Sequence, residues 1–359
     1  MTIRADALGG AMLTMRKRRH FLTQLGIAGA AGLGGFSLTG VRTFAAEQPP
    51  EVTTVRLEKD PGTCIAPQVA EELLRAEGFT DIRYVDLTET HLRRAAATGA
   101  NFVVDMIDHD EVDFARGFAP GMVIGMGAGA PVTVLAGLHS GCFEIFGKVN
   151  IHRIADLKGT TIGVSGGGNG DEELLKIMAK SVGLDPAKDM RWVASASVEP
   201  MDLFIAGKID AFLAVPPQLQ EVRARNIGHV IASSITDRPW SQYYCCLLAA
   251  RTEFVRKYPI ATKRVLRAIL KAADLCVSEP QLIARLLVEH GYTSRYDYAL
   301  EMLNELRYNV WRDFDAEDTL RFYALRLQEV GIIKSSPQKL IDEHTDWRFL
   351  NELKRELKA

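Results

Sequence analysis

Apolar and polar residues in the first part of the chain alternate between the periods of strands and helices. Residues 53–57 alternate like a strand and stop at a turn at 60–62, and residues 82–85 form a second such run. Between them, Ile65, Val69 and Leu73 fall on one face of a helix that Gly78 ends. The chain therefore opens as a strand–helix–strand unit, which predicts a parallel sheet.

The same pattern returns further along. A strand at 112–114, a helix at 119–127 and a strand at 131–136 follow one another. A second series starts with a strand at 161–164, a glycine-rich turn and a helix at 172–182. The segment 112–136 is weakly similar to the segment 209–232 in the order of its apolar runs and prolines. This internal similarity predicts two related α/β lobes.

From Thr252 onward the apolar residues follow helical spacing only. The runs lie at 254–275, 282–288, 298–306 and 320–330. No linker separates them from the preceding chain. We therefore expect a helical layer that packs back on the first lobe, and not an independent domain.

The amino terminus has the pattern of an export signal. A basic group at 16–19 precedes a weakly apolar, glycine- and alanine-rich run at 26–38, with small residues near 43–45. A mitochondrial address is the alternative, but such peptides scatter their arginines. Arg18 and Arg19 resemble a twin-arginine signal, which implies bacterial export of a folded protein. Residues 1–45 are thus predicted to be removed, and the location is predicted to be periplasmic.

Composition narrows the function classes. The predicted signal contains six of the 43 basic residues but one of the 45 acidic residues, so the remaining chain has a net charge of −7. Its charges are interspersed, which excludes the basic stripe of a nucleic-acid-binding protein. No run of about 18 apolar residues follows residue 46, so we expect no membrane span in the mature chain.

Five cysteines are too few and too irregularly spaced for a disulfide framework. A bridge between the neighbours Cys245 and Cys246 would be strained, so all five are predicted to be small buried apolar side chains. No pair has zinc-type spacing, and His139 is expected to be a satisfied residue at a strand end. We predict no metal and no cofactor.

Four segments carry a family resemblance. They are Gly-Ala-Pro-Val-Thr-Val-Leu-Ala at 129–136, Ile-Ala-Asp-Leu-Lys-Gly-Thr-Thr-Ile-Gly-Val at 154–164, Ala-Gly-Lys-Ile-Asp-Ala at 206–211 and Phe-Val-Arg-Lys-Tyr-Pro at 254–259. In this order the mature chain resembles the solute-binding proteins of nitrate, sulfonate and taurine ABC importers. The resemblance implies an α/β, two-lobed periplasmic binding protein type II fold with a cleft between the lobes and a helical C-terminal layer on lobe 1. Lobe 1 would comprise 52–137 plus 246–359, and lobe 2 would comprise 138–245.

The resemblance also implies a function. Such a protein captures a small organic or anionic molecule by hinge closure and delivers it to an inner-membrane ABC permease. A monomer is expected. A periplasmic ligand sensor without transport would need the same cleft and stays open as an alternative.

Candidate ligand contacts lie at the predicted strand ends and lobe crossings. The glycine-rich loop after the strand at 161–164 offers backbone N–H groups at a helix start, where anions bind readily. However, Asp171, Glu172 and Glu173 follow at once and would repel an anion, which makes a neutral or cationic ligand equally plausible. Asn169 with Glu172 fits a capping box, so part of this acidity is ordinary helix chemistry. The full set is Thr63, Cys64, Phe114, Arg116, Cys142, Glu144, Ser165, Gly166, Gly167, Asn169, Trp240 and Tyr244.

Other residues have structural or enzymatic interpretations. Asp113 and Asp210 precede strands and are expected to accept hydrogen bonds from nearby backbone. Cys245-Cys246 is similar to part of a cysteine cluster in the thiamine-pyrimidine synthases of fungi, which suggests an enzyme as a further alternative. The chain contains no His-Glu-x-x-His motif, and the export signal disfavours a biosynthetic role, so we expect a binding protein.

Overall fold

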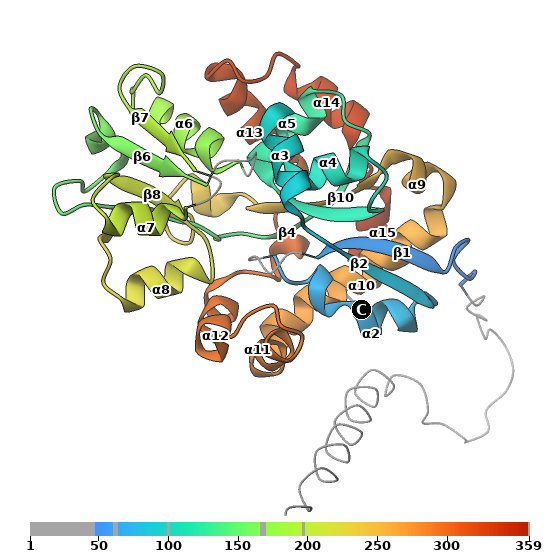
Figure 1. Cartoon of the computed structure of the whole chain (residues 1–359). Coiled ribbons are helices and arrows are strands. Elements are labelled where there is room, and N and C mark those ends of the chain that lie inside the picture. The colour runs from blue at the N-terminus through green and yellow to red at the C-terminus, as the bar shows by residue number, and fades with distance from the viewer. Residues whose placement is uncertain (1–46, 60–63, 99–100, 166–169, 196–197, 358–359) are drawn as a thin grey trace, which may run out of the picture. The chain divides into compact units, whose positions relative to one another are not determined.

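The strands of the protein form two sheets of five strands each, seen at the left and right of Figure 1. The computed structural model describes residues 47–59, 64–98, 101–165, 170–195 and 198–357. The predicted export signal therefore lies outside the described residues.

The first sheet has the order β2-β1-β3-β10-β4. Its strands are β1 (Thr54–Lys59), β2 (Asp81–Asp86), β3 (Phe114–Phe118), β4 (Val132–His139) and β10 (Cys246–Arg251). β1 pairs in parallel with β2 and β3, as the opening pattern predicted. β10 runs antiparallel to both β3 and β4, so the sheet as a whole is mixed, a feature that the opening pattern did not predict. The reason is that β10 enters the sheet as the chain returns from the second sheet.

The second sheet repeats this arrangement with the order β7-β6-β8-β5-β9. Its strands are β5 (Glu144–Gly147), β6 (Thr161–Val164), β7 (Arg191–Ala194), β8 (Ala211–Ala214) and β9 (His229–Ser233). β6 pairs in parallel with β7 and β8, and β5 is antiparallel to β8 and β9. The internal similarity of the sequence thus corresponds to a repeated topology, in which β3 and β4 match β8 and β9.

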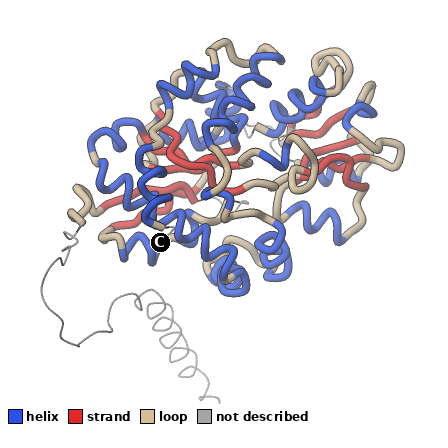
Figure 2. The backbone as a smooth tube through the Cα atoms, turned by 180° about the vertical axis from the view of Figure 1, so that it is seen from behind, coloured by secondary structure: helices blue, strands red, loops and turns tan. Residues whose placement is uncertain are grey.

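Helices accompany both sheets, and Figure 2 shows them on both sides of the strands. Those before β10 are η1 (Pro67–Val69), α2 (Glu71–Ala76), α3 (Glu89–Thr98), α4 (Phe102–Asp108), α5 (Ala119–Gly127), η2 (Ile154–Leu157), α6 (Asp171–Ser181), α7 (Pro200–Ile205), α8 (Gln218–Ala224) and η3 (Trp240–Gln242). The predicted helix from Ile65 to Gly78 is shorter than expected. Its first turn is the separate 3₁₀ turn η1, which has a proline at its start.

The carboxyl-terminal third is helical, as predicted. Its elements are α9 (Thr252–Lys257), α10 (Pro259–Ser278), α11 (Pro280–Glu289), α12 (Tyr296–Glu305), η4 (Val310–Arg312), α13 (Ala316–Glu329), α14 (Pro337–His344) and α15 (Arg348–Glu356). α10 packs on α2, α13 and α14 pack on α5, and α15 contacts β4, so this layer covers the first sheet. None of the helices in the described ranges is both long and apolar enough to cross a membrane.

Two aspartates hold equivalent strand pairs together in the two sheets. The Asp113 carboxylate accepts a hydrogen bond from the backbone N–H of Arg56 on β1, at 2.9 Å. The Asp210 carboxylate accepts one from the backbone N–H of Thr161 on β6, at 2.8 Å. Both contacts are the structural hydrogen bonds that the sequence predicted. Because the two contacts are equivalent, Asp113 can be aligned with Asp210 and Arg56 with Thr161, and other positions of the two sheets can be matched by counting from these residues.

Candidate functional site

The two sheets are joined by two crossing segments, residues 140–143 between β4 and β5 and residues 234–245 between β9 and β10. These segments lie against each other. The Phe143 N–H donates to the Ser234 hydroxyl at 2.9 Å, and the Ser234 N–H donates to the Phe143 carbonyl at 3.0 Å. Gly141 has a φ of +79°, and a Cβ there would lie 3.2 Å from the Ile235 Cα. The junction of the two halves is therefore a tightly packed pair of chain segments.

Four cysteines gather at this junction. Cys64, Cys142, Cys245 and Cys246 are all buried, and the structure joins Cys64 to Cys246 and Cys142 to Cys245 in disulfides. The sequence correctly predicted burial, but the prediction that they are merely small apolar side chains without bridges is wrong. The paired residues are 182 and 103 positions apart: the crossings bring Cys142 to Cys245, while Cys64, after β1, meets Cys246 at the start of β10. Cys276, on α10, stays free and buried, as predicted.

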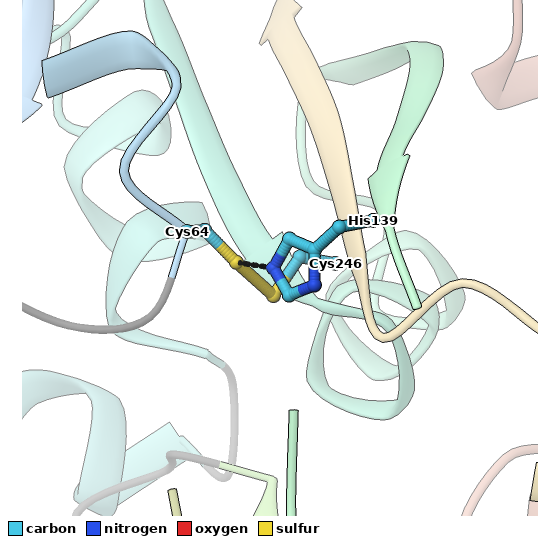
Figure 3. Close-up of side chains that lie close together, drawn as sticks. All are labelled: Cys64, His139 and Cys246. Carbon is cyan, nitrogen blue, oxygen red and sulfur yellow. Dashed lines mark hydrogen bonds between the residues drawn. A yellow bond between two sulfur atoms is a disulfide. The ribbon is translucent and has the colours of Figure 1, made fainter. Parts of the chain in front are cut away.

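His139 lies inside the same group (Figure 3). Its ring is fully buried, and its Nε2 lies 2.7 Å from the Cys64 Sγ. Burial, together with the nearby positive charge of Arg116, lowers the pKa of His139 to about 3, so the imidazole is neutral at physiological pH. His139 does end β4 as predicted. Its Nδ1, however, makes no hydrogen bond of ordinary geometry within the described part of the chain, so the expectation of a satisfied histidine is wrong.

A buried ion pair lies beside this group. Glu58 on β1 and Arg116 on β3 are 1% and 6% exposed. The Glu58 carboxylate accepts the backbone N–H of Arg116 at 3.2 Å and lies 3.5 Å from the Arg116 Nε. A buried charge is tolerated only when it is paired in this way. The first sheet therefore carries both a buried ion pair and thiols.

The glycine-rich loop is described only at its ends. Thr63, Gly166, Gly167 and Asn169 lie outside the described residues. α6 begins at Asp171 with Gly170 as its N-cap, in a left-handed conformation with a φ of +88°. The prediction of a capping box between Asn169 and Glu172 is therefore wrong, because Gly170 occupies the capping position.

The acidic start of α6 is largely engaged in local contacts. The Asp171 carboxylate accepts the Ser165 N–H at 2.8 Å and the Ser165 hydroxyl at 2.5 Å. Glu172 forms an ion pair with Lys176 at 2.6 Å, while burial raises the pKa of Glu173. Two of the three carboxylates are thus paired, which weakens the electrostatic argument against an anionic ligand.

Three aromatic candidates are fixed by packing contacts. Phe114 stands edge-on to Phe254 at a centroid distance of 5.3 Å, and Trp240 stands edge-on to Phe322 at 5.7 Å. The Tyr244 hydroxyl donates to the Val310 carbonyl at 2.9 Å.

Among the residues predicted from the sequence, the structure brings Cys64, Cys142 and Arg116 into one neighbourhood. Phe114, Trp240 and Tyr244 are held by contacts within the protein, and their role in ligand binding stays a prediction.

Arg223 on α8, which the sequence did not single out, connects the two halves. Its guanidinium bonds to the buried Glu144 carboxylate on β5 at 2.6 Å and 2.9 Å. It also reaches Glu305 on α12, at 2.6 Å, and Glu301, at 3.4 Å. Since α12 belongs to the helical layer on the first sheet, one arginine of the second half is bound to both halves. This interaction has no local sequence signal, because its partners are 78 to 82 residues away.

A small recess lies next to these contacts. It is bounded by Ile65, which follows Cys64, by Pro217 at the start of α8, and by Tyr292 and Met302 of the helical layer. Its lining is apolar, with the Tyr292 and Thr293 side chains as polar groups. The space inside it that water can occupy is about 10 Å³, room for about one water molecule, so the recess is far smaller than small-ligand pockets of about 300–1,000 Å³.

Curated relatives match the sequence over short stretches. The nitrate import ATP-binding protein NrtC of Synechocystis sp. is 28% identical over 103 residues, which cover 29% of this chain and 15% of NrtC. The bicarbonate-binding protein CmpA of Synechococcus elongatus is 30% identical over 94 residues, which cover 26% of this chain and 20% of CmpA. The match thus spans one fifth or less of the length of these relatives.

Solved structures match the fold over most of the chain. The periplasmic nitrate-binding protein NrtA from Synechocystis PCC 6803 has a TM-score of 0.70 at 15% identity, covering 87% of this chain and 90% of NrtA. The alkanesulfonate-binding protein SsuA from Xanthomonas axonopodis pv. citri has a TM-score of 0.61 at 13% identity, covering 79% and 96%. The predicted two-lobed fold is therefore confirmed. Residues 92–283, just over half of the chain, match the family described as NMT1/THI5 like, and this protein belongs to that family.

Proposed function

We propose that this protein is the periplasmic substrate-binding component of an ABC importer, which captures a small organic or anionic molecule between two lobes. Lobe 1 would be 52–137 plus 246–359, and lobe 2 would be 138–245. The observation that carries the proposal is that the chain passes between two sheets of the same topology through the paired crossings at 140–143 and 234–245. Two rigid bodies on such a junction can rotate toward each other around a ligand.

Contacts across the junction support a closing motion. Arg223 of lobe 2 is bonded to Glu305 of lobe 1, and α6 contacts α5 and α13. At Gly170, a Cβ would lie 3.0 Å from the Phe118 ring and 3.2 Å from the Gly121 nitrogen. These contacts join residues of different lobes, so they would form as the lobes close. A ligand that binds both lobes would stabilise this form by its differential affinity for the closed form.

The names of the similar proteins support the class of ligand. NrtA is a nitrate-binding protein, SsuA binds alkanesulfonates and CmpA binds bicarbonate. Asp171 accepts a hydrogen bond from Ser165, and Glu172 forms an ion pair with Lys176. These contacts reduce the repulsion that an anion would meet beside the glycine-rich loop. An inner-membrane permease with its ATPase would be the partner, and the chain would act in the periplasm after export by the twin-arginine route.

A thermal-shift screen of the purified protein tests the proposal. Nitrate, bicarbonate, alkanesulfonates, amines and pyrimidines are compared at equal concentration, because a ligand of the folded state raises the melting temperature by mass action. At a concentration 100 times Kd the folded state gains about 2.7 kcal/mol. Small-angle scattering with the best compound should show a smaller radius of gyration. Identical dimensions with and without a tightly bound compound would rule out hinge closure.

Arg223 provides a matched pair of variants for the same experiment. Arg223→Ala removes the contacts to Glu144 and Glu305, whereas Arg225→Ala, just beyond the end of the same helix, removes only an ion pair with Glu221 of α8. We expect Arg223→Ala to weaken ligand binding by about 10-fold, equivalent to about 1.4 kcal/mol, and Arg225→Ala to leave it unchanged. Equal affinities in both variants would show that Arg223 plays no part in closure.

An enzyme is the second candidate, and the contact between Cys64 and His139 favours it. A thiol 2.7 Å from a neutral imidazole has the geometry of an activated nucleophile once the disulfide is reduced. Incubation of the reduced protein with the compounds that shift its melting temperature distinguishes the two. A substrate-binding protein returns each compound unchanged, whereas turnover that Cys64→Ser abolishes would support catalysis.

A further inference from the structure

Five side chains at the junction can each donate an electron pair to a soft metal ion, and we call them the thiol cluster. They are Cys64, His139, Cys142, Cys245 and Cys246. Two sets of three share His139, and within each set the ligand atoms lie within 4.8 Å of one another. The sulfurs of Cys245 and Cys246 are 3.9 Å apart. Four sulfurs and one imidazole nitrogen therefore surround one small, buried region.

We propose that the thiol cluster, with its cysteines reduced, is a binding site for one thiophilic metal ion of the Zn²⁺ or Cu⁺ class. Such ions take thiolate sulfur and imidazole nitrogen as ligands. Four ligands complete a tetrahedral structural site, and the cluster offers five groups for these four positions. Each cysteine that binds the ion gives up its proton, so the ion replaces protons within the cluster.

The position of His139 supports a metal site in addition to the two disulfides. Two disulfides use four sulfurs and leave the imidazole without a function, yet its ring is buried in their midst and its Nε2 faces the Cys64 Sγ (Figure 3). The ligand atoms of His139 lie within 4.8 Å of the sulfurs in both sets of three, so one imidazole can serve either set. The Nδ1 of this buried ring makes no hydrogen bond of ordinary geometry within the described part of the chain, which is unfavourable, and coordination would compensate for this.

The backbone holds the ligands in a fixed frame. His139 and Cys246 are paired residues on the antiparallel strands β4 and β10. The Cys245 N–H donates to the His139 carbonyl at 2.9 Å, and the Cys245 carbonyl accepts the Ala119 N–H at 2.8 Å. A register shift between Cys246 and Leu247 makes β10 irregular at its start, where two neighbouring cysteines contribute to one site. A site built on strand ends in this way is preorganised for its ion.

The buried pair of Glu58 and Arg116 would form the surroundings of the ion. The charge of Arg116 already acts on His139, and it would offset part of the negative charge that several thiolates bring.

The disulfide-bonded form excludes the metal-bound form, because a sulfur in a disulfide carries no thiolate charge to donate. The ion would bind at the junction, as a part of the protein separate from any molecule captured between the lobes.

Metal titration of the reduced full chain tests this inference. The chain is purified under argon with a phosphine reductant and titrated with Co²⁺ as a spectroscopic probe and with Zn²⁺. We expect one equivalent to bind, with sulfur-to-cobalt charge-transfer absorption in the near ultraviolet that Zn²⁺ removes. X-ray absorption of the zinc form should show sulfur neighbours at about 2.3 Å. A zinc ion with oxygen and nitrogen neighbours alone, or no bound metal, would overturn the inference.

Cysteine variants add a control within the same chain. The double variant Cys245→Ser with His139→Asn leaves three of the five groups and should weaken Zn²⁺ binding by about 100-fold or more, since even changes outside the first ligand shell weaken such sites by about 10- to 100-fold. Cys276→Ser removes the buried free cysteine outside the cluster and should bind Zn²⁺ like the wild type. Equal binding by the double variant and by Cys276→Ser would contradict the site. A failure of the metal-site inference can be told apart from a failure of the proposed function, because the proposed function is judged by small-molecule binding and lobe closure.

Discussion

The two sheets share one topology but differ in what they bury. In each, an aspartate at the start of a strand accepts the backbone N–H of a neighbouring strand, which matches Asp113 to Asp210. Counting from these positions, Glu58 and Arg116 of the first sheet correspond to Gly163 and Leu213 of the second. A buried ion pair in one half thus stands where the other half has apolar or small residues. The strand topology that both sheets share therefore does not depend on the charges of Glu58 and Arg116.

The difference shows where the specialised chemistry of the molecule lies. His139 ends β4 and Cys246 starts β10, so the thiol cluster also belongs to the first sheet and its crossings. The second sheet has an aromatic cluster of Phe146, Phe204 and Phe212 around its core instead. We infer that the repeat supplies the scaffold, and that the first half carries the polar groups that distinguish this protein.

The largest effect should come from making the first sheet resemble the second. Arg116→Leu removes the guanidinium from a carboxylate that is 1% exposed, and breaking a buried ion pair in this way costs about 3–5 kcal/mol. Adding Glu58→Met to Arg116→Leu should restore most of that stability, because an apolar pair replaces a charge that has lost its partner. Urea unfolding measures both variants. If the double variant were no more stable than the single one, the ion pair would not be the cause.

A smaller effect should separate the two aspartates. Asp113 accepts hydrogen bonds from the Arg56 N–H, from the Arg56 guanidinium and from Arg251, and its side chain is 6% exposed. Asp210 accepts from the Thr161 N–H and from Lys148, and it is 28% exposed. Hydrogen bonds to charged groups contribute about 1.5–3 kcal/mol each. We expect Asp113→Asn to cost about 2–4 kcal/mol and Asp210→Asn about half as much, because partial exposure weakens the latter.

Urea unfolding of the two asparagine variants under identical conditions makes this comparison. Asp202→Asn serves as a control for the substitution itself, since the described residues show no side-chain hydrogen bond for this α7 residue. Equal losses at Asp113 and Asp210 would mean that the two positions are energetically equivalent despite their different surroundings.

Much of the fold could be predicted from the sequence, because its elements have local signals. The helix predicted at 119–127 is α5, and the strand predicted at 161–164 is β6. β10 was missed because it lies between β3 and β4 and is buried along nearly its whole length. A strand buried on both faces shows no alternation of apolar and polar residues.

The site was harder to predict than the fold. Motifs for disulfides and metals depend on short spacings, whereas the thiol cluster joins residues on two crossings and the first strand end. Cys64, Cys142 and Arg116 were chosen for their places at strand ends and crossings, and these places do meet. The roles of His139 and Arg223 depend on contacts over 75 or more residues, which no local pattern contains.

Two glycines offer a test of the contact between the halves. Gly170 and Gly183 have φ values of +88° and +85°, so alanine at either position should cost about 1–2 kcal/mol of stability. Only Gly170 faces the other half: a Cβ added there would lie 3.0 Å from the Phe118 ring, while one added at Gly183 would meet nothing within 4 Å. We expect Gly170→Ala alone to weaken ligand binding as well, measured by calorimetry. Equal ligand affinities would show that the halves can close without this contact.

The smallest effect concerns the pH dependence of the second sheet. Burial raises the pKa of Asp210, but hydrogen bonds from Lys148 and from the Thr161 N–H outweigh burial and lower it below the ordinary value of 3.8. A carboxyl group whose pKa is lower in the folded state stabilises the fold above its unfolded pKa, and this stabilisation disappears as the pH falls through the folded value. Asp210→Asn should therefore lose stability at pH 6, and this loss should shrink as the pH falls below the unfolded pKa of about 3.9. Unfolding free energies measured from about pH 6 to about pH 2.5 should converge for variant and wild type at the acid end. A constant difference across this range would show that the loss comes from packing, and that the charge of Asp210 contributes nothing to the stability of the second sheet.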